Sequence, residues 1–197
     1  MAAIQLCKPA PDDAEELLAF ELGNRRYFER SVASRGDAYY TIEAVRRVIA
    51  EAECASRNDL SHQFLLKVDG DIVGRVNLTA VTRSNFNKAS LGYRIGEHFS
   101  GRGYATQAVD LVLQEAFGKL NLRRLEATAR ADNLGSVRVL ERSGFTVYGR
   151  AENCMCLDGV WRDLLYFERR SRPQPYLAVH NQELAENSIK PPTGNLN

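Results

Sequence analysis

Two glycines flank an arginine just before an expected helix, within the segment EHFSGRGYATQA over residues 97–108. The N–H groups in the first turn of a helix have no partner inside that helix, and the helix dipole places partial positive charge at the same end. The segment therefore predicts either an anion-binding loop or an ordinary tight turn between a strand and a helix. If an anion binds here, the residues expected to contact it are Gly101, Arg102, Gly103, Tyr104, Ala105 and Thr106.

The glycine spacing excludes two common phosphate-binding patterns. A dinucleotide-binding G-x-G-x-x-G would need a third glycine where this chain has Thr106, and the G-K-[ST] of a P-loop is absent from the sequence. What remains is a strand, a short glycine-containing loop and a helix whose N–H groups can converge on a phosphate.

A second helix is predicted over residues 133–144. Asn133 suits its N-cap, because an asparagine side chain can accept a hydrogen bond from the first turn, and Gly144 suits its C-terminal stop. Ser136 lies in the first turn, where its hydroxyl either bonds the backbone or faces a ligand.

The elements around these segments follow from the period of the apolar residues. Two hairpins are predicted, at Asp69-Gly70 and Asp158-Gly159, because Asp-Gly favours a two-residue turn. The strands are expected over residues 4–8, 62–68, 71–81, 88–96, 124–130, 145–157 and 160–170, and the helices over 11–22, 41–54, 104–117 and 133–144.

The resulting order, β-α-α-β-β-β-α-β-α-β-β, predicts an α/β (mixed α+β) fold rather than a continuous doubly wound alternation. The first helix is expected to present Leu17, Leu18 and Leu22 on one side, and residues 24–40 are expected to be irregular.

Composition limits the class of protein. The 197 residues carry 26 Lys+Arg against 25 Asp+Glu, a formal charge of +1, which argues against a general nucleic-acid or membrane-surface role. No apolar run reaches the length of a membrane span, and the N-terminus lacks the pattern of a signal peptide, so a cytoplasmic location is expected. We expect one domain over residues 1–170, followed by a polar tail over 171–197 that holds four of the six prolines.

The cysteines and histidines do not form a recognisable metal-binding pattern. The cysteines are Cys7, Cys54, Cys154 and Cys156, and the histidines are His62, His98 and His180. Free thiols are expected in a reducing compartment, and no metal site is expected.

Five segments, spread over roughly residues 4–170, resemble the GNAT N-acetyltransferases. GRGYAT is similar to their pyrophosphate loop, Gln/Arg-x-x-Gly-x-Gly/Ala, with Gly103 and Ala105 at its last two fixed positions. NLGSVRVLERSGF resembles their second motif, and LGYRIG resembles the strand before the loop. LDGVWRD and GNRRYFERS are similar to segments of the RimJ/RimL-like branch, which acetylates ribosomal-protein N-termini.

The resemblance implies a GNAT fold, with a central, mostly antiparallel sheet splayed around an acetyl-CoA loop and flanked by helices. It implies acetyl-CoA as co-substrate, no metal, and direct attack of an amine on the thioester. The backbone N–H of Ile95 would act as an oxyanion contact, and Asn133 and Ser136 would contact the cofactor. Ser136 would also protonate the departing thiolate, the alternative being a hydroxyl that bonds backbone at the helix start.

Two positions depart from the family pattern. Ser100 replaces the first Gln or Arg of the loop signature, and Leu140 replaces a tyrosine that serves many relatives as general acid. No strong general base stands out. The side chains considered for that role are Glu97, His98, Glu152 and Asp163.

A site without a strong base favours an acceptor amine of low pKa, which indicates a protein N-terminus rather than a lysine. Glu21, Glu29 and Asp37 are acids that could attract a cationic amine, or could simply be solvated surface charges. Two alternatives stay open, a small-molecule amine as acceptor and a CoA-binding module without turnover. A monomer or a homodimer is expected, with no nucleic-acid or membrane partner.

Overall fold

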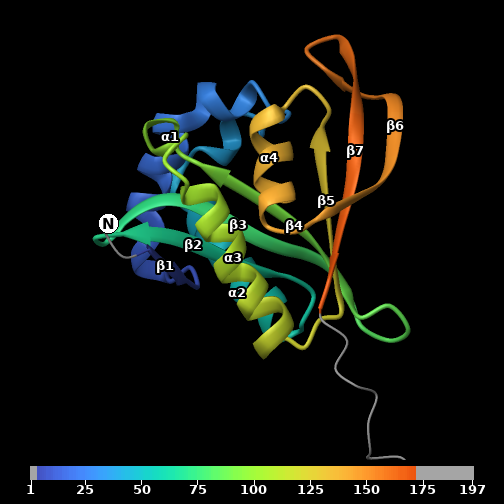
Figure 1. Ribbon diagram of the computed structural model, residues 1–197. Helices are drawn as coiled ribbons and strands as arrows, with labels where there is room; N and C mark the ends of the chain where they lie inside the picture. Colours follow the sequence, from blue (N-terminus) through green and yellow to red (C-terminus); the bar gives the residue numbers. More distant parts are fainter. Residues whose placement is uncertain (1–3, 172–197) are drawn as a thin grey trace, which may run out of the picture.

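The computed structural model describes residues 4–171 and contains one mixed sheet with helices on both faces (Figure 1). The strands are β1 Ile4–Cys7, β2 His62–Val68, β3 Asp71–Thr82, β4 Lys88–Ile95, β5 Arg124–Arg130, β6 Thr146–Leu157 and β7 Val160–Arg170. They lie in the order β1-β2-β3-β4-β5-β7-β6. Every neighbouring pair is antiparallel except β4 and β5, which confirms the expected mostly antiparallel sheet.

The sheet opens at its one parallel pair. β4 and β5 are in register only from Lys88↔Arg124 to Leu91↔Ala127. Past that point β4 continues along β3 to Ile95, while β5 continues along β7 to Arg130. The two strands therefore separate at their carboxyl ends, and the predicted splay is confirmed.

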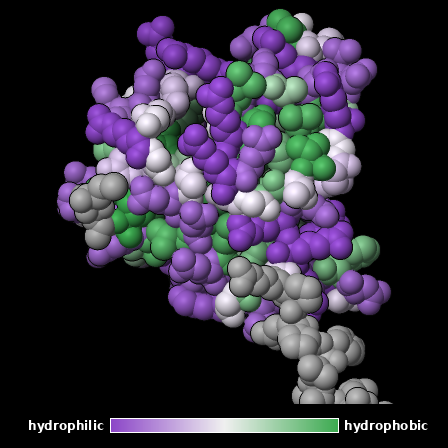
Figure 2. Space-filling model, in the orientation of Figure 1, coloured by the Kyte–Doolittle hydropathy of each residue, from purple (hydrophilic) through white to green (hydrophobic). Residues whose placement is uncertain are grey.

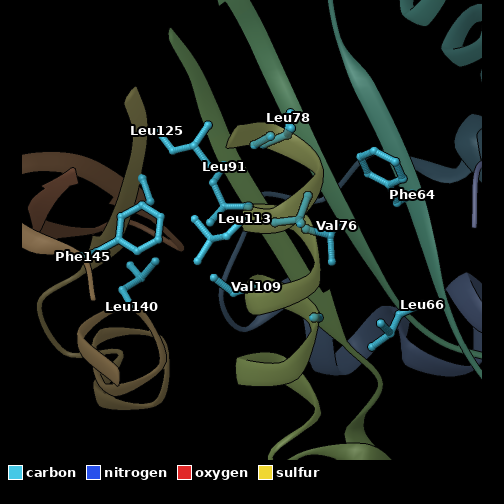
Figure 3. Close-up of a cluster of buried hydrophobic side chains, with 14 of the residues drawn as sticks. Phe64, Leu66, Val76, Leu78, Leu91, Val109, Leu113, Leu125, Leu140 and Phe145 are labelled. Carbon is cyan, nitrogen blue, oxygen red and sulfur yellow. The ribbon is translucent and has the colours of Figure 1, made fainter. Parts of the chain in front are cut away.

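Two hydrophobic cores hold the helices against opposite faces of the sheet. The helices are α1 Ala14–Glu29, α2 Ile42–Arg57, α3 Tyr104–Gln114 and α4 Leu134–Arg142. The larger core packs α3 and α4 against the sheet through residues such as Val109, Leu113 and Leu140 (Figure 3). The smaller core packs α1 and α2 against Leu65 and Ile72 on the other face.

Both predicted hairpins form with the backbone that Asp-Gly favours. Asp69 and Gly70 have φ of 53° and 99°, and Asp158 and Gly159 have φ of 51° and 76°. Left-handed values at both central positions belong to a type I′ turn, which matches the twist of the flanking strands.

The first helix is longer than expected. It runs to Glu29, so residues 24–29, expected to be irregular, are helical. An i,i+4 ion pair between Arg25 and Glu29, with a distance of 3.0 Å, supports this last stretch, and Phe28 within it is buried in the smaller core. The expected inward face is also wrong in part, because Leu22 is 48% exposed whereas Phe20 and Glu21 are buried.

The third helix ends differently from the prediction. α3 is regular to Gln114, and the chain then makes a π-helical turn over Glu115–Lys119, which contains Gly118. Ala116, inside that turn, is fully buried and keeps the apolar face continuous.

The expected tail over residues 171–197 lies outside the described residues, apart from Ser171, whose N–H donates to the carbonyl of Arg123 at 2.9 Å. No helix within residues 4–171 is long and apolar enough to cross a membrane. The face that carries α3 and α4 is largely hydrophilic, with hydrophobic side chains visible in the upper right of the view, near β6 and β7 (Figure 2).

Candidate active site

A cavity of about 670 Å³ lies where β4 and β5 separate. Its wall combines α1 and the loop that follows it, strands β3, β4 and β5, the loop before α3 with the first turn of that helix, and one side of α4, with single residues from β6 and β7. Because α1 lies on one face of the sheet and α3 and α4 lie on the other, the cavity is lined from both faces. The size is in the range of small-molecule and cofactor sites.

The glycine loop, residues 101–106, forms part of this wall and has the backbone conformation expected of an anion-binding turn. Gly101 and Gly103 have φ of 74° and 83°, values that L side chains rarely adopt. Gly103 is the N-cap of α3, so the free N–H groups of the first helical turn follow it directly. Four of the six residues expected to bind an anion line the cavity, namely Gly101, Gly103, Ala105 and Thr106.

The side chains of the other two loop residues do not reach the wall. Arg102 is exposed and is absent from the cavity lining. Tyr104 packs edge-on against Phe99, with ring centroids 6.0 Å apart. Both residues keep their backbone groups in the predicted loop, just before α3 and at its first position.

The backbone of Ile95 faces the opening between the strands. The Gly96 N–H donates to Val73 O at 2.9 Å, so Gly96 and Val73 form a hydrogen-bonded pair of the β3–β4 ladder. Such pairs alternate with non-bonded ones, so Ile95, opposite Gly74, directs its N–H and C=O away from β3. That direction leads to the gap left by β5, as the predicted oxyanion contact requires.

The start of α4 brings two more predicted residues to the cavity. The Asn133 side chain accepts a hydrogen bond from the Ser136 N–H at 3.1 Å, so the predicted N-cap is present. Ser136 lines the cavity. Among the described residues, its hydroxyl makes no hydrogen bond to backbone, which favours the ligand-facing interpretation over the capping one.

Tyr93 is a cavity residue that the sequence interpretation missed. Its hydroxyl donates to the carbonyl of Ser136 at 3.2 Å and so ties β4 to α4 across the opening. Burial raises the pKa of Tyr93 to about 12, with the Ser136 contact acting in the opposite direction. The phenol therefore stays protonated near neutral pH and can serve as a hydrogen-bond donor.

The charged side chains that line the cavity are all positive. Among the described residues, five arginines and no carboxylate or imidazole form its wall. The five are Arg75, Arg94, Arg130, Arg138 and Arg142. Little in the sequence could have revealed them. Arg75 and Arg94 are charged residues within largely apolar predicted strands, and Arg138 and Arg142 have the i,i+4 spacing that places them on one side of a helix.

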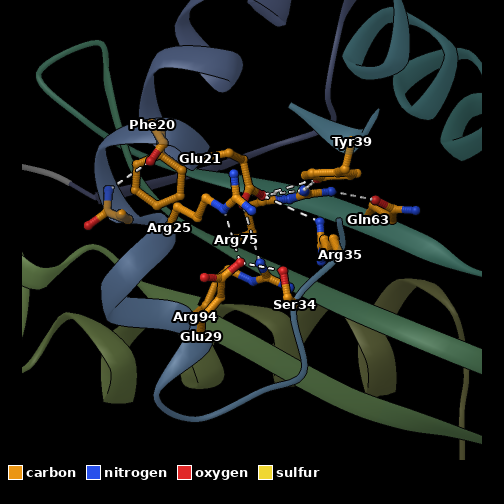
Figure 4. A network of polar contacts seen from close by, with 11 residues as sticks. Phe20, Glu21, Arg25, Glu29, Ser34, Arg35, Tyr39, Gln63, Arg75 and Arg94 are labelled. Atoms are coloured by element: carbon orange, nitrogen blue, oxygen red, sulfur yellow. Dashed lines mark hydrogen bonds and ion pairs between the residues drawn. The ribbon is translucent and has the colours of Figure 1, made fainter. Parts of the chain in front are cut away.

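A buried polar cluster lies behind the wall on the side of α1 and reaches the cavity through Arg75 and Arg94 (Figure 4). Glu21 is fully buried and lies 2.6 Å from Arg75, which also donates to Tyr39 at 2.9 Å and to Gln63 at 2.9 Å. Arg94 approaches the same carboxylate at 3.3 Å. Glu21 is therefore a structural partner of arginines and not the solvated or amine-attracting acid that the sequence allowed.

The other two acids considered for attracting an amine are also paired. Arg25 contacts Glu29 at 3.0 Å and Asp37 at 2.7 Å. Hydrogen bonds from Ser34 and then Arg25 hold the pKa of Glu29 below its usual range. Neither carboxylate lines the cavity.

The candidate bases lie away from the cavity as well. Glu97 and His98 are exposed, and Glu152 and Asp163 are absent from the cavity lining. The Asn153 N–H and then Arg150 hold the pKa of Asp163 below its usual range, so this carboxylate is committed to the β6–β7 hairpin. Residues 4–171 contain no cluster of His, Cys, Asp or Glu that could hold a metal ion.

Both departures from the family pattern have structural roles. The Ser100 hydroxyl lies 2.8 Å from the Tyr27 hydroxyl, which links the glycine loop to α1. Leu140 is 1% exposed and packs beside Phe145 in the larger core (Figure 3). It supports the cavity wall but provides no proton.

The family model described as the acetyltransferase (GNAT) domain matches residues 4–146. The chain belongs to the GNAT acetyltransferase family. The probable N-acetyltransferase YjcK of Bacillus subtilis is 38% identical over 153 residues, which make up 77% of this chain and 84% of that protein. The ribosomal protein uS5-alanine N-acetyltransferase of Escherichia coli is 31% identical over 93 residues, 47% of this chain and 48% of that protein.

Solved GNAT structures agree with the fold. Mycobacterium smegmatis RimJ in complex with CoA-disulfide superposes with a TM-score of 0.81 and 25% identity, over 94% of this chain and 90% of that one. The microcin C7 self-immunity acetyltransferase MccE, in complex with acetyl-CoA and AMP, gives a TM-score of 0.76 and 26% identity, over 85% and 92%. The protein is therefore a GNAT N-acetyltransferase, and family membership favours an enzyme over a module without turnover.

Proposed function

We propose that this enzyme transfers the acetyl group of acetyl-CoA to the N-terminal amine of a protein. The observation that carries the proposal is the composition of the cavity wall. Among the described residues that line it, no Asp, Glu or His is present to remove a proton from the incoming amine. The acceptor must then provide a useful fraction of neutral amine by itself.

The reference pKa values separate the two kinds of protein amine. A lysine side chain, with a pKa of ~10.4, is only about 0.1% neutral near pH ~7.4. An α-amine, with a pKa of ~7.8, is about a quarter neutral at the same pH. The difference of more than a hundredfold in reactive species supports an N-terminal acceptor, as does the similarity to the uS5-alanine N-acetyltransferase.

The residues present fit acetyl-CoA, which would supply the activated acetyl thioester. The two left-handed glycines leave backbone N–H groups open at the start of α3, where a pyrophosphate would bind. Arg138 and Arg142, on the wall provided by α4, add positive charge for the same polyanion.

The chain's own groups would act on the reaction in two places. The Ile95 N–H would donate to the acetyl oxygen, a contact commonly worth about 3 kcal/mol of barrier. The Ser136 hydroxyl would donate to the sulfur as its bond to carbon breaks. The amine nitrogen forms the new bond to the acetyl carbon, its proton passes to water, and CoA leaves as the thiolate.

A small-molecule amine is the second candidate acceptor. The similarity to MccE, whose structure contains both acetyl-CoA and AMP, favours it. The five arginines in the wall disfavour a polyamine such as spermidine, because like charges would repel each other there.

An acceptor panel tests the proposal. CoA release near neutral pH is compared for a peptide with a free N-terminus, its N-blocked form with an internal lysine, and spermidine, with mass-spectrometric location of the acetyl group. We expect turnover of the free N-terminus. Acetylation only of the blocked peptide or of spermidine would refute the N-terminal assignment.

A further inference from the structure

Three arginines share one carboxylate on the α1 side of the cavity (Figure 4). The shortest distances from Glu21 are 2.6 Å to Arg75, 3.3 Å to Arg94 and 3.7 Å to Arg35. Three positive charges against one negative charge leave two charges uncompensated within the cluster. Such an excess in a partly desolvated wall favours an anionic ligand.

Arg94 is the member of the cluster that a ligand can reach. Glu21 and Arg75 have side chains only 1% and 4% exposed, and Arg35 is 30% exposed but does not line the cavity. The Arg94 side chain is 21% exposed and lines the cavity. Its guanidinium lies over the ring of Phe28, 5.1 Å from the centroid, on the C-terminal half of α1. A guanidinium carries five N–H donors, and the 3.3 Å contact to Glu21 occupies at most a part of them.

The pKa values of the two neighbouring arginines shift in opposite directions, in agreement with their different pairing to Glu21. Tyr39 and Glu21 raise the pKa of Arg75 above its usual value in spite of the opposing effect of burial. Burial lowers the pKa of Arg94, and Arg35 and Arg75 lower it further, against the effect of Glu21. Glu21 therefore satisfies Arg75 and leaves Arg94 short of negative charge.

A further arginine lies at the same end of the cavity. Arg130, on β5, donates to the carbonyl of Arg30 at the end of α1 at 3.1 Å. It lines the cavity and pairs with Asp132 at 3.0 Å, but Asp132 also pairs with Arg162 at 3.0 Å. Here too a single carboxylate serves two cations, so no local acid neutralises the excess at Arg94.

We propose that the acceptor of this acetyltransferase carries a carboxylate close to its reactive amine, and that Arg94 binds this carboxylate on the α1 side of the cavity. The planar fork of an arginine matches a carboxylate with two parallel hydrogen bonds. The inference rests on the proposed function and refines it, since a protein N-terminus would meet it with Asp or Glu within its first few residues.

The experiment compares amidated peptides that differ by one charge, with Asp, Asn or Lys at the second position behind the same N-terminal alanine. For the unaltered enzyme we expect kcat/KM to be at least about tenfold higher for the Asp peptide than for the Asn peptide, and lowest for the Lys peptide. Free aspartate and its diamide, which lacks both carboxylates, form a second arm, and this arm separates a peptide carboxylate from that of a small amino acid.

Variants at Arg94 assign the preference to this residue. Arg94→Gln should reduce the Asp-to-Asn ratio to about one while the KM for acetyl-CoA stays unchanged, and Arg94→Lys should keep part of the ratio. Arg46→Gln is the matched control, because Arg46 is an exposed arginine of α2 whose nearest acid lies 3.9 Å away. The control should retain the full ratio, and thermal melts should show that each variant is folded.

The outcomes separate this proposal from the N-terminal one. Equal turnover of the Asp and Asn peptides, or a preference that survives Arg94→Gln, overturns the carboxylate proposal and leaves the N-terminal acceptor standing. Arg94-dependent turnover of free aspartate, without turnover of any peptide, supports the carboxylate proposal and refutes the protein N-terminus as acceptor. If neither peptide turns over, calorimetry with their N-acetylated forms and CoA gives the same comparison, and equal or absent binding overturns the carboxylate.

Discussion

The two faces of the sheet build the cavity by different means. On the face of α3 and α4, the wall offers backbone groups of two glycines at φ of 74° and 83° before α3 and an asparagine cap on α4, to which Arg138 and Arg142 of α4 add charge. On the face of α1, charged side chains from distant parts of the chain meet in the wall and directly behind it. Glu21 and Arg75 are 54 positions apart, and Glu21 and Arg94 are 73 positions apart.

The contrast suggests a division of labour. Acetyl-CoA presents the same phosphates and amides in every enzyme that uses it, and backbone N–H groups suit such a constant ligand. Acceptors vary in charge and shape, and side chains can be exchanged without altering the fold. The predictions below test whether the two faces are independent in this way.

The largest effect is expected at Glu21. Glu21→Gln removes the one carboxylate that serves the buried Arg75, so we expect a loss of about 3–5 kcal/mol in the free energy of unfolding. Urea unfolding followed by circular dichroism measures it. The double variant Glu21→Leu with Arg75→Leu should recover most of the loss, because it removes both buried charges. A loss below about 1 kcal/mol for the single variant would contradict the structural role.

The second prediction concerns the backbone face. Gly103→Asp should weaken acetyl-CoA binding at least about tenfold, ~1.4 kcal/mol or more, because it places a negative charge where phosphate is expected. Gly103→Asn is the control, since asparagine has nearly the same shape and tolerates the left-handed backbone at Gly103 without adding charge. Calorimetry with acetyl-CoA compares the two. Equal affinities for Asp and Asn would show that no phosphate binds there.

A smaller effect is expected at Ser136. Ser136→Ala should lower kcat about tenfold with little change in the KM for acetyl-CoA, if the hydroxyl acts on the leaving thiolate. The melting temperature should stay close to that of the parent, because the cap is provided by Asn133. Unaltered kcat together with reduced stability would instead assign the hydroxyl to the helix start.

The smallest effect is expected at Asp59, an acid that pairs with an arginine as Glu21 does but is half-exposed. Hydrogen bonds from Arg83 and then His62 hold the pKa of Asp59 at about 2. A carboxyl whose pKa is lower in the folded than in the unfolded state stabilises the fold at pH values above its unfolded pKa of ~3.9. It loses that contribution as the pH falls through its folded pKa of about 2. Asp59 is 39% exposed, so solvent screening limits the cost of Asp59→Asn to about 1 kcal/mol at pH ~7. The difference from the parent, measured by urea unfolding, should vanish between pH ~4 and ~2, and a pH-independent difference would rule out the charge as its cause.

The sequence predicted the backbone face better than the side-chain face. The glycine loop, the Asn133 cap and both Asp-Gly hairpins are local signals, carried by residues whose conformational preferences act within a few positions. The extension of α1 to Glu29 was not predicted because the polar run Asn24, Arg25 and Arg26 interrupts the apolar pattern. In the structure, buried Phe28 packs against Phe20 and an ion pair between Arg25 and Glu29 supports the last turn.

The arginine cluster needed the register of the sheet. Arg75 and Arg94 come together because β3 and β4 pair them directly opposite each other, and that pairing is invisible in either strand alone. For the same reason, the sequence alone did not show that Glu21 is buried, because its nearest arginine partners lie on the strands beneath α1. The sequence did not predict Tyr93 as a site residue, because only the separation of β4 and β5 brings its hydroxyl to α4.

The opening between β4 and β5 has a kinetic consequence. A cavity lined from both faces of the sheet can admit acetyl-CoA along α3 and α4 and the acceptor along α1, so neither substrate has to leave before the other enters. Both would then be bound at once, and the acetyl group would pass between them without resting on the protein. Double-reciprocal plots of initial rate against one substrate, at several fixed concentrations of the other, should give intersecting lines. Parallel lines would mean instead that CoA leaves before the acceptor binds and that the protein carries the acetyl group in between.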